Sequence, residues 1–335
     1  MELSRKVQEF IQNETDGKGL KNLKKSFETL SKKYINEEKN SEFVTNEEDS
    51  LVYALSRMLA TYNVNYFVAK DLLYLIQQYK LEEIETLTDV GCGTLAGSLA
   101  FNDVFCLSKT IGLEKNGFML NFSRKMVQNC SLANYELKDC DMTNQPIDSS
   151  DIILASFSLN ELKDEKLFCV LDKLVSSTKK YLVIVEAGTP KRFEFMKMIK
   201  NYILPKGLSL VAPCANVKEC PISGDDWCHF YCRLNRTKEQ KFFKDATKSY
   251  EDEKFTYLIF SKQKFVANYS RIIARPQVRK GVISFKICSL NGVFKKDVTA
   301  KEKQMFKMAK KLDCGNIFLQ EENVKNDKID SWKYR

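Results

Sequence analysis

Between residue 84 and about residue 190, short apolar segments alternate with helix-length segments. Strands are expected over residues 85–90, 109–113, 151–156 and 181–186. Parallel strands need a long crossover between them, usually a helix, so this alternation is typical of a parallel sheet covered by helices. It predicts an α/β, Rossmann-like core, and a chain of 335 residues leaves room for extensions around that core.

The segments on either side of the core differ from it in pattern. In residues 51–62 and 66–78, apolar side chains recur every three or four positions without proline, which predicts helices. No apolar run reaches the roughly 20 residues of a membrane span, and the amino terminus resembles neither a secretory nor a transit signal. A soluble, cytoplasmic protein without a membrane partner is therefore expected. The predicted division is an N-terminal helical region over 1–80, the core over 81–262 with a cysteine-rich insertion at 212–236, and a basic C-terminal extension with a small β component over 263–335.

A glycine turn follows the first expected strand, in the order Asp89-Val90-Gly91-Cys92-Gly93-Thr94-Leu95. Glycines let a ligand approach the backbone, and the start of the next helix offers unpaired N–H groups. About twenty residues later, Glu114 ends the second strand, where a carboxylate can accept hydrogen bonds from both ribose hydroxyls of an adenosine ligand. The turn resembles motif I of the class I S-adenosylmethionine-dependent methyltransferases, with Leu95 in place of the third glycine. The candidate cofactor-binding residues are Asp89, Gly91, Gly93, Glu114, Asp139 and Asp141; a Rossmann-like fold with an empty pocket is the alternative.

The sequence supports this cofactor fold better than it supports a reaction. The segment after the strand at 151–156 lacks the Asn-Pro-Pro-aromatic signature of enzymes that methylate amino groups. Neither Cys140 nor Cys169 lies in the context of a cytosine-C5 nucleophile. Glu161 is equally well explained as an acid at the start of a helix. No catalytic residue is therefore assigned.

Positive charge is concentrated in the second part of the chain. The net charge is +9, yet residues 1–190 sum to −6 and residues 191–335 to +15. Between residues 254 and 311 there are 15 basic residues and two acidic ones. Such a block is typical of a protein that binds a phosphate backbone, and a solvated lysine-rich surface is the alternative. The aromatic residues among these bases either pack a small sheet or stack on nucleic-acid bases: Tyr257, Phe260, Phe265, Tyr269 and Phe285.

Four of the eleven cysteines fall between residues 214 and 232. In a reducing compartment they are not expected to form disulfides. The prolines and polar residues around them predict a loop, and a thiol-rich loop is typical of a metal site. Zinc and iron–sulfur clusters both accept four cysteines, and the spacing here matches neither the usual zinc-knuckle pairs nor a bacterial ferredoxin run. Buried, inert cysteines are the alternative.

Several runs in the chain occur together in one known family. The most specific are Ala-Pro-Cys at 212–214, Glu-Cys-Pro at 219–221 and Asp-Trp-Cys-His-Phe at 226–230, with further runs at 57–62, 183–190, 250–258 and 275–288. Together they resemble the methyltransferase-like factors of the small ribosomal subunit from bacteria and mitochondria, over roughly residues 50–316. The departures are Leu59 and Ala187, where that family tends to have proline, Leu95 in the turn, and Cys314-Gly315-Asn316 in place of Trp-Gly-Asp.

The resemblance implies a class I methyltransferase fold that carries a four-iron iron–sulfur (4Fe-4S) cluster. It implies the cluster ligands Cys214, Cys220, Cys228 and Cys288, the last within an expected strand over 282–288. A local site that uses Cys232 or the sole histidine, His229, is the competing assignment and would favour zinc. The implied cofactors are therefore a 4Fe-4S cluster, with zinc as the alternative, and S-adenosylmethionine.

Two functions are compatible with these features. The first is a small ribosomal subunit assembly factor that binds ribosomal RNA (rRNA) in a subunit precursor and is a monomer away from the ribosome. The second is an active S-adenosylmethionine-dependent rRNA methyltransferase. The candidate RNA contacts are basic residues of the C-terminal part: Arg271, Arg275, Arg279, Lys280, Lys307, Lys310 and Lys311.

Overall fold

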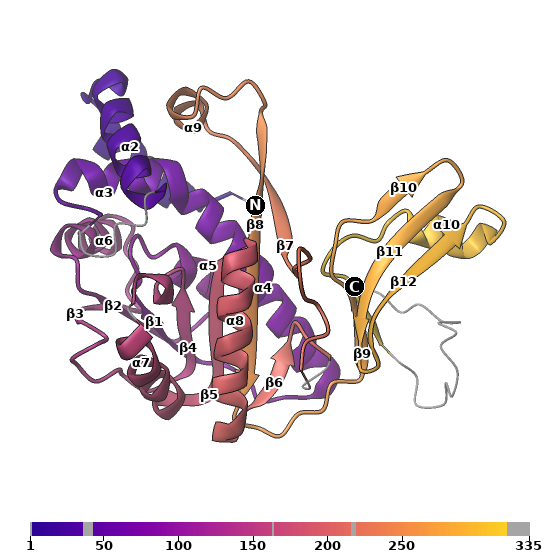
Figure 1. Cartoon of the computed structure of the whole chain (residues 1–335). Coiled ribbons are helices and arrows are strands. Elements are labelled where there is room, and N and C mark those ends of the chain that lie inside the picture. Colours follow the sequence, from indigo (N-terminus) through magenta and orange to yellow (C-terminus); the bar gives the residue numbers. More distant parts are fainter. Residues whose placement is uncertain (1, 36–42, 163, 216–218, 320–335) are drawn as a thin grey trace. The chain divides into compact units, whose positions relative to one another are not determined.

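The computed structural model describes residues 2–35, 43–162, 164–215 and 219–319 (Figure 1). The chain forms two compact units, each made of two segments. Unit 1 comprises the residues up to 185 together with 232–253, and unit 2 comprises 186–231 together with the residues from 254 onward. The three-part division expected from the sequence stays a prediction.

The core of unit 1 is a parallel sheet with the strand order β3-β2-β1-β4-β5. The strands are β1 (Thr86–Val90), β2 (Lys109–Glu114), β3 (Tyr135–Asp139), β4 (Ser150–Ser156) and β5 (Thr178–Ala187), and the crossover helices are α5 (Ala96–Phe105), α6 (Gly117–Asn129) and α7 (Asp164–Ser177) (Figure 1). This order is that of a Rossmann-type sheet. Strands β1 and β4 are buried along nearly their whole length, as expected where helices cover both faces. The predicted α/β, Rossmann-like core and its four predicted strands are confirmed.

Strands β3 and β7 (Phe230–Asn235) are among those that the sequence did not predict. Strand β3 lies at the edge of the sheet and carries Glu136, Lys138 and Asp139, so it lacks the apolar run that β4 and β5 have. Strand β7 falls within the segment expected to be a cysteine-rich loop. The prediction of a loop over the cysteine-rich segment at 212–232 is therefore wrong at its C-terminal end.

Helices precede the sheet, as predicted. They are α1 (Arg5–Thr15), α2 (Leu20–Ile35), α3 (Glu47–Tyr53), a π-helical turn η1 (Ala54–Met58) and α4 (Leu59–Tyr79). Their apolar faces pack together and against α6, for example through Phe10 and Phe122, whose ring centroids lie 5.3 Å apart. Within the described ranges, none of the helices combines the length and apolar character that crossing a bilayer requires.

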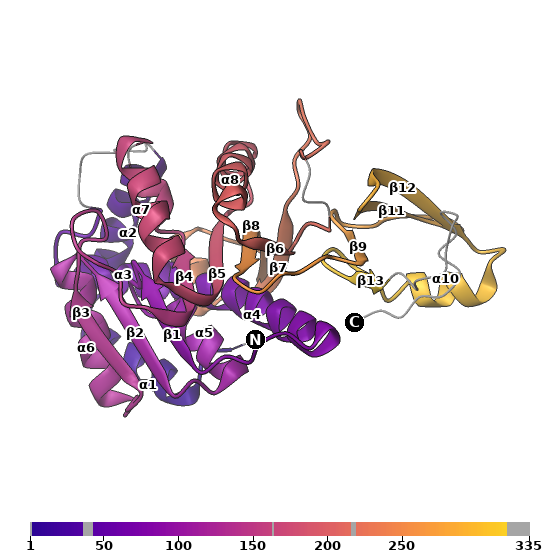
Figure 2. The ribbon, with the colours of Figure 1, turned by 90° about the horizontal axis from the view of Figure 1, so that it is seen from below.

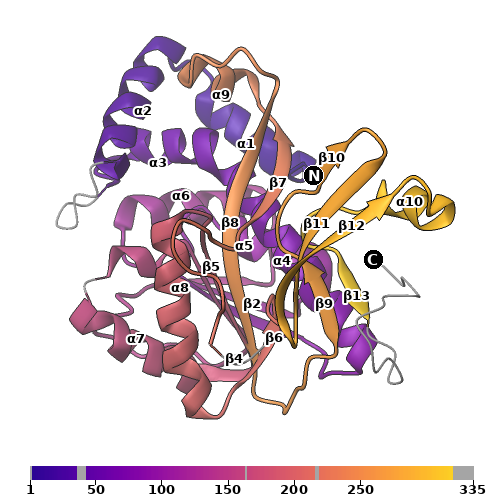
Figure 3. The same ribbon diagram turned by 45° about the vertical axis from the view of Figure 1, so that its right-hand side comes forward.

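The outer part of a long hairpin, residues 232–253, completes unit 1 (Figure 3). Strand β7 leads into α9 (Lys238–Phe243), and the chain returns along β8 (Tyr250–Ser261). Helix α9 begins with a capping box in which Thr237 and Gln240 exchange hydrogen bonds. The helix packs on α2, where the Phe243 ring stacks on Phe27 at 5.4 Å. The hairpin is thereby fixed to the N-terminal helices.

Unit 2 contains a helix, an antiparallel strand pair and a five-stranded sheet. Its elements are α8 (Pro190–Ile203), the 3-10 turn η3 (Leu204–Lys206), β6 (Ser209–Ala212) paired with β8, then β9 (Tyr269–Ile272), β10 (Gln277–Arg279), β11 (Val282–Ser289), β12 (Gly292–Thr299), α10 (Lys303–Ala309) and β13 (Ile317–Leu319). Strand β11 pairs with β9, β10 and β12, so the predicted small β extension and the strand at 282–288 are confirmed. Helix α10 lies beside β12 (Figure 2) and packs on the apolar face of this sheet.

The aromatic residues of the basic block pack the protein interior. Tyr257, Phe260 and Tyr269 are fully buried, and Phe265 and Phe285 are at most 9% exposed. Of the two alternatives left open by the sequence, packing within the protein is therefore correct. None of these five rings is available to stack on RNA bases.

Candidate functional site

The glycine turn lies at the C-terminal edge of the unit 1 sheet, between β1 and α5. Gly91 has φ +77°, and its N–H donates to the Leu113 carbonyl at 2.8 Å. A Cβ added to Gly91 would lie 2.6 Å from the Cβ of Ser158, closer than side-chain carbons approach. The position therefore requires glycine both for its backbone angle and for its space.

Leu95 stands where the methyltransferase pattern has its third glycine. It has φ +61° and ψ +13°, in the left-handed region that glycine adopts freely. Its side chain is fully buried in the hydrophobic core, and one methyl carbon lies 3.3 Å from where a Cβ on Gly112 would be. The turn thus keeps a glycine-type backbone at this position, at a conformational cost of roughly 1–2 kcal/mol.

Two of the predicted cofactor carboxylates lie side by side at this edge. Glu114 accepts hydrogen bonds from the backbone N–H of Gly93 at 3.0 Å and from that of Asn116 at 2.8 Å. Burial raises the pKa of Glu114, and these two bonds oppose the rise. Asp139 is exposed and lies opposite Glu114 in the β2–β3 register. A ribose bound by Glu114 would have to share the carboxylate with the Gly93 N–H.

Asp141 lies on the loop after β3. Its carboxylate accepts hydrogen bonds from the N–H and the hydroxyl of Thr143 at 2.9 and 2.8 Å. Burial acts against the charged form, but these bonds and nearby lysines lower the pKa of Asp141. The structure therefore places all six predicted cofactor residues on or next to the C-terminal ends of β1, β2 and β3.

Asp89, the acid that opens the turn, is fully enclosed. One carboxylate oxygen accepts hydrogen bonds from the N–H of Ser98 at 3.2 Å and from its hydroxyl at 2.5 Å. Burial raises the pKa of Asp89 to about 6 in spite of these bonds. The Asp89 side chain therefore holds the first turn of α5 against the end of β1.

Asn65 is a polar residue near the turn that no sequence pattern singled out. It lies within the mainly apolar α4, is fully buried, and donates to the Ser156 hydroxyl at 2.8 Å. Among the residues that the structure describes, neither the Asn65 side-chain oxygen nor the Ser158 hydroxyl has a hydrogen-bond partner. Unsatisfied polar atoms in a buried place are unusual, and they mark this side of the turn as a place for a polar ligand group.

A second candidate site is the four-cysteine pocket of unit 2. Its wall includes Cys214, Cys220, Cys228 and Cys288, the four cysteines implied as cluster ligands by the family resemblance. The rest of the wall is largely apolar, with Phe193, Met196, Ile222, Leu258 and Ile273 among its members, and it also includes Lys197 and Lys200. Cys288 reaches the pocket from β11, as the predicted strand required.

Burial raises the pKa of three of these thiols, those of Cys214, Cys228 and Cys288. Burial raises the pKa of Cys288 to about 12, and the neighbouring thiols of Cys214 and Cys220 add to the rise. Burial likewise raises the pKa of Cys214, against the positive charges of Lys200 and Arg271. All eleven cysteines of the chain are free thiols. Four neighbouring thiols ionise together only when a cation binds them, because four bare thiolates would repel one another in a buried place.

The four thiols suit the coordination needs of two metal groups unequally. In the described ranges, no three His, Cys, Asp or Glu side chains are close enough to share one metal ion. A single zinc ion holds each thiolate at about 2.3 Å and so draws its ligands together tightly. A four-iron cluster binds one thiolate at each iron, so its ligands stand farther apart. Four separated thiols in an apolar wall fit the cluster better, although the central space of ≈ 40 Å³ must widen to admit it.

Three further side chains were candidates or neighbours of the metal site. Cys232 belongs to unit 1 and is not among the residues that line the pocket. The His229 ring stacks on Trp227 with centroids 5.1 Å apart, and burial lowers its pKa. Cys314, one of the departures from the family pattern, is buried, and its thiol lies 3.6 Å from the His229 carbonyl oxygen. The competing local site built on Cys232 is therefore not favoured by the placement of these residues.

Six of the seven predicted RNA contacts are exposed, namely Arg275, Arg279, Lys280, Lys307, Lys310 and Lys311. The guanidinium of Arg275 lies over the Tyr231 ring at 4.1 Å. The remaining residue, Arg271, is fully buried, and it donates to the carbonyl oxygens of Pro213 and Gly315, both at 3.0 Å. A buried arginine cannot reach a phosphate backbone, so the prediction of Arg271 as an RNA contact is wrong.

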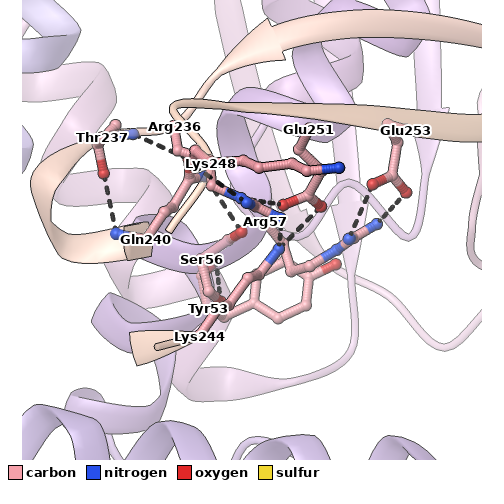
Figure 4. A network of polar contacts seen from close by, with 10 residues as sticks. All are labelled: Tyr53, Ser56, Arg57, Arg236, Thr237, Gln240, Lys244, Lys248, Glu251 and Glu253. Carbon is pink, nitrogen blue, oxygen red and sulfur yellow. Dashed lines mark hydrogen bonds and ion pairs between the residues drawn. The ribbon is translucent and has the colours of Figure 1, made fainter. Parts of the chain in front are cut away.

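The run at 57–62 that contributed to the family resemblance has a structural role in unit 1 (Figure 4). Arg57, in the π-helical turn, makes a two-pronged ion pair with Glu253 of β8, at 2.8 and 3.3 Å. Next to it, Glu251 accepts from Arg236 at 2.9 Å and from Lys244 at 2.8 Å. The Arg57–Glu253 pair joins the hairpin to the N-terminal helices, whereas the two pairs of Glu251 lie within the hairpin.

A sequence profile of Rsm22, described as a mitochondrial small ribosomal subunit protein, matches residues 47–319. The match covers more than half of the chain, and it includes the glycine turn and all four cysteines of the pocket. No protein with a curated function matches the chain in sequence. The description of the family is of a mitochondrial protein, in contrast to the cytoplasmic location expected from the sequence.

Several solved methyltransferase structures are similar to parts of the chain. A magnesium protoporphyrin IX methyltransferase from Synechocystis is 11% identical, with 69% of this chain and 93% of that chain covered and a TM-score of 0.39. The N-methyltransferase NodS from Bradyrhizobium japonicum is 11% identical, with coverage of 58% and 86% and a TM-score of 0.38. A methyltransferase from Aquifex aeolicus is 17% identical, with coverage of 45% and 85% and a TM-score of 0.35. Likeness at this level carries no conclusion about substrate or reaction.

Proposed function

Because the chain belongs to the Rsm22 family of mitochondrial small ribosomal subunit proteins, we propose that it is an assembly factor of the small ribosomal subunit. It binds rRNA of the subunit precursor as a monomer and carries a 4Fe-4S cluster on Cys214, Cys220, Cys228 and Cys288. The observation that carries this proposal is the pocket in which two separate segments of unit 2 present four thiols to the same space.

The cluster would connect the ligand loop to the sheet. Three of its ligands lie on the segment between β6 and β7, and the fourth lies on β11. When bound, a four-iron cluster supplies iron–thiolate bonds, and their energy adds directly to the folding free energy of the unit that they join. The cluster therefore stabilises the unit that also carries the basic block of the chain.

The decisive experiment is anaerobic purification of the wild type, Cys288→Ser and Cys232→Ser, followed by assays for iron, sulfide and zinc. We expect about four irons and four sulfides per chain in the wild type and in Cys232→Ser, and their loss in Cys288→Ser. Cys232 is the matched control, because it is a cysteine of the same sequence cluster that does not line the pocket. One zinc per chain that depends on Cys232 and is indifferent to Cys288 would contradict the proposal.

The rRNA-binding surface is proposed from the exposed bases of unit 2. They form two groups: Arg275, Arg279 and Lys280 lie around β10, whereas Lys307, Lys310 and Lys311 lie on and after α10. Arg279 donates to Ser284 at 3.1 Å, on the sheet face opposite the one that α10 covers. The two groups therefore offer separate surfaces to a phosphate backbone.

Two triple alanine variants distinguish these surfaces. Arg275, Arg279 and Lys280 are replaced in one variant, and Lys307, Lys310 and Lys311 in the other. Each lost phosphate contact lowers the slope of log affinity against log salt by roughly 0.7–0.9. We expect one variant to bind a small-subunit rRNA fragment more weakly and with a smaller salt slope. Unchanged affinity and slope in both variants would contradict RNA binding through these bases.

A second function, rRNA methylation with S-adenosylmethionine, is favoured by the backbone of the glycine turn. Leu95 keeps the left-handed conformation of a glycine, so the turn retains the shape that the motif needs. Asp89, Gly91, Gly93, Glu114, Asp139 and Asp141 would hold the cofactor, which supplies an activated methyl group. In this role the chain positions the two reactants.

Complementation separates the two functions. A strain without the gene is supplied with the wild type or with Gly93→Arg, and small-subunit rRNA is mapped for methylated nucleotides. Because a Cβ at Gly93 would already lie 3.3 Å from Met119, an arginine there fills the turn. A methyl mark restored only by the wild type would favour the enzyme, whereas assembly restored by both proteins without a mark would favour the scaffold.

A further inference from the structure

Two cationic side chains are buried next to the cysteines of the pocket in unit 2. Lys200, on the last turn of α8, lines the same wall as the four thiols and is 4% exposed. Arg271, on β9, is fully buried and lies opposite Cys288 in the β9–β11 register. Residues opposite each other on neighbouring strands point to the same face of a sheet, so Arg271 and Cys288 share a face.

We propose that Lys200 and Arg271 are positioning residues that hold the anionic metal group of the four-cysteine pocket and set its reduction potential. This inference rests on the proposed cluster. It assigns a role to Arg271 that replaces the RNA contact expected from the sequence. It also distinguishes Lys200 from Lys197, which lines the pocket one turn earlier.

The electrostatic reason is the sign of the charge that enters the pocket. Four thiolates outweigh the positive charge of an oxidised four-iron core, and one-electron reduction adds a further negative charge. Net charge and nearby groups are known determinants of cluster potential. In a buried place a charge is poorly screened, so a fixed cation favours the more negative, reduced state.

Arg271 adds a mechanical role to its charge. Its side chain donates to the carbonyl of Pro213, the residue before the ligand Cys214, and to the carbonyl of Gly315, the residue after Cys314. It therefore ties the start of the ligand loop to the strand that lies next to Cys288. A lysine at this position keeps the charge but cannot make both bonds with the geometry of a guanidinium.

Lys197 is the matched control for Lys200. Its amino group pairs with Glu194 at 3.0 Å, and its side chain is 23% exposed. A paired and partly solvated cation has a weaker effect on a buried charge than an enclosed one. Removal of the Lys197 charge is therefore expected to change the potential much less than removal of the Lys200 charge.

The test uses the full chain with its metal group, as wild type, Lys200→Met, Lys200→Arg and Lys197→Met. An anaerobic dye titration followed by electron paramagnetic resonance gives the reduced-to-oxidised ratio at fixed potential. We expect Lys200→Met to lower this ratio about tenfold, which corresponds to a shift of about 59 mV for a one-electron couple. Lys200→Arg and Lys197→Met are expected to stay within about twofold of the wild type. Equal ratios in Lys200→Met and Lys197→Met would overturn the inference.

A second measurement tests the role of Arg271, and it can also be made if the titration of the potential fails. The rate of metal loss to a chelator is measured for Arg271→Lys, Arg271→Met and Lys200→Met. We expect faster metal loss in all three variants. Arg271→Lys should nevertheless have a reduction potential close to that of the wild type, because it keeps the charge and loses only the hydrogen bonds to the ligand loop. Unchanged rates in all three variants would contradict the inference.

The two proposals fail in different ways. Purified wild type that holds zinc and no iron overturns the proposed cluster, and the chelator rates still test the two cations against that zinc. If the wild type holds about four irons and the Lys200→Met and Arg271 variants behave like the wild type, the proposed cluster stands. The proposed role of the two cations is then overturned.

Discussion

Two carboxylates at the glycine turn of unit 1 are hydrogen-bonded within the chain, whereas the thiols of the four-cysteine pocket in unit 2 oppose one another's ionisation. Glu114 accepts from Gly93, and Asp89 accepts from Ser98, so the turn is held by its own side chains. In the pocket, Cys214 and Cys220 both raise the pKa of Cys288. The two carboxylates of the turn have partners without a ligand, whereas the pocket gathers thiols that ionise together only when a cation binds them.

This difference indicates where each unit depends on its ligand. Groups that bond within the chain contribute to folding before a cofactor binds, so S-adenosylmethionine would enter a preformed turn. Thiols brought together in an apolar wall gain their bonds only from a metal, and metal binding is then part of folding. Unit 2 is therefore expected to be far more sensitive to ligand removal than unit 1.

The largest expected effect comes from removing the metal. In metal-free protein, amide hydrogen exchange on β9 and β11 is expected to speed up by about a thousandfold, which corresponds to about 4 kcal/mol of lost protection. Exchange on β1 and β4 is expected to stay unchanged, because their bonds lie within the parallel sheet. Mass-spectrometric exchange on metal-bound and metal-free protein measures both. An equal loss of protection in the two units would break the comparison.

The next largest effect tests the glycine turn itself. Gly91→Ala adds a Cβ 2.6 Å from that of Ser158 at a φ of +77°. Strain at a positive φ costs roughly 1–2 kcal/mol and overpacking roughly 1–3 kcal/mol, so about 3 kcal/mol of unfolding free energy should be lost. Denaturation in urea, monitored by circular dichroism, measures the loss.

Gly17→Ala is the control for the clash at Gly91. Gly17 has a φ of +78°, but an added Cβ would meet nothing within 4 Å. It should therefore lose only the strain of about 1 kcal/mol. Adding Ser158→Gly to Gly91→Ala should recover the difference. Equal losses in the two single variants would show that the turn is looser than the packing around Gly91 indicates.

The sequence predicted elements whose signal is local and missed features that depend on tertiary placement. Strand β4 was predictable because residues 152–155 form an unbroken apolar run. Strand β1 and the glycine turn were predictable together, because the turn residues are adjacent and directly follow the strand. The pocket cysteines were assigned only through a family resemblance, since Cys288 reaches the others by the fold of a separate sheet. The burial of Arg271 could not be predicted, because a basic residue in a basic block has the composition of a surface.

A smaller effect concerns the pH dependence that Asp89 gives to unit 1. Burial raises the pKa of Asp89 from 3.8 to about 6, so the folded state holds a proton that the unfolded state has already released over this range. Stability is therefore lost as the pH rises from about 4 to about 6, and the full penalty remains above that range. Asp89→Asn removes the charge and should stabilise the protein by about 2 kcal/mol at pH 7.

The pH at which this gain disappears identifies its cause. Below about pH 3 the carboxyl group is largely protonated in both states, so Asp89→Asn and the wild type should unfold at the same urea concentration. A gain of equal size at pH 4 and pH 7 would show that the effect comes from packing and not from the charge of Asp89. The expected cost of the variant is weaker binding of S-adenosylmethionine, as is common where a functional acid is kept at the expense of stability.

The smallest expected effect is a reversal at Leu95 of the usual preference of helical positions for alanine over glycine. At an interior helical position such as Leu99 on α5, replacement by Ala should leave a more stable protein than replacement by Gly, by about 1 kcal/mol. At Leu95 the φ of +61° penalises Ala and not Gly, so Leu95→Gly should be more stable than Leu95→Ala by about 1 kcal/mol. Both Leu95 variants lose a fully buried side chain and fall below the wild type. Urea denaturation of the four variants measures the difference in stability between the Ala and Gly variants at each position. If the Ala variant is the more stable one at both positions, Leu95 does not hold a glycine conformation. The observation that favours methyl transfer would then be removed.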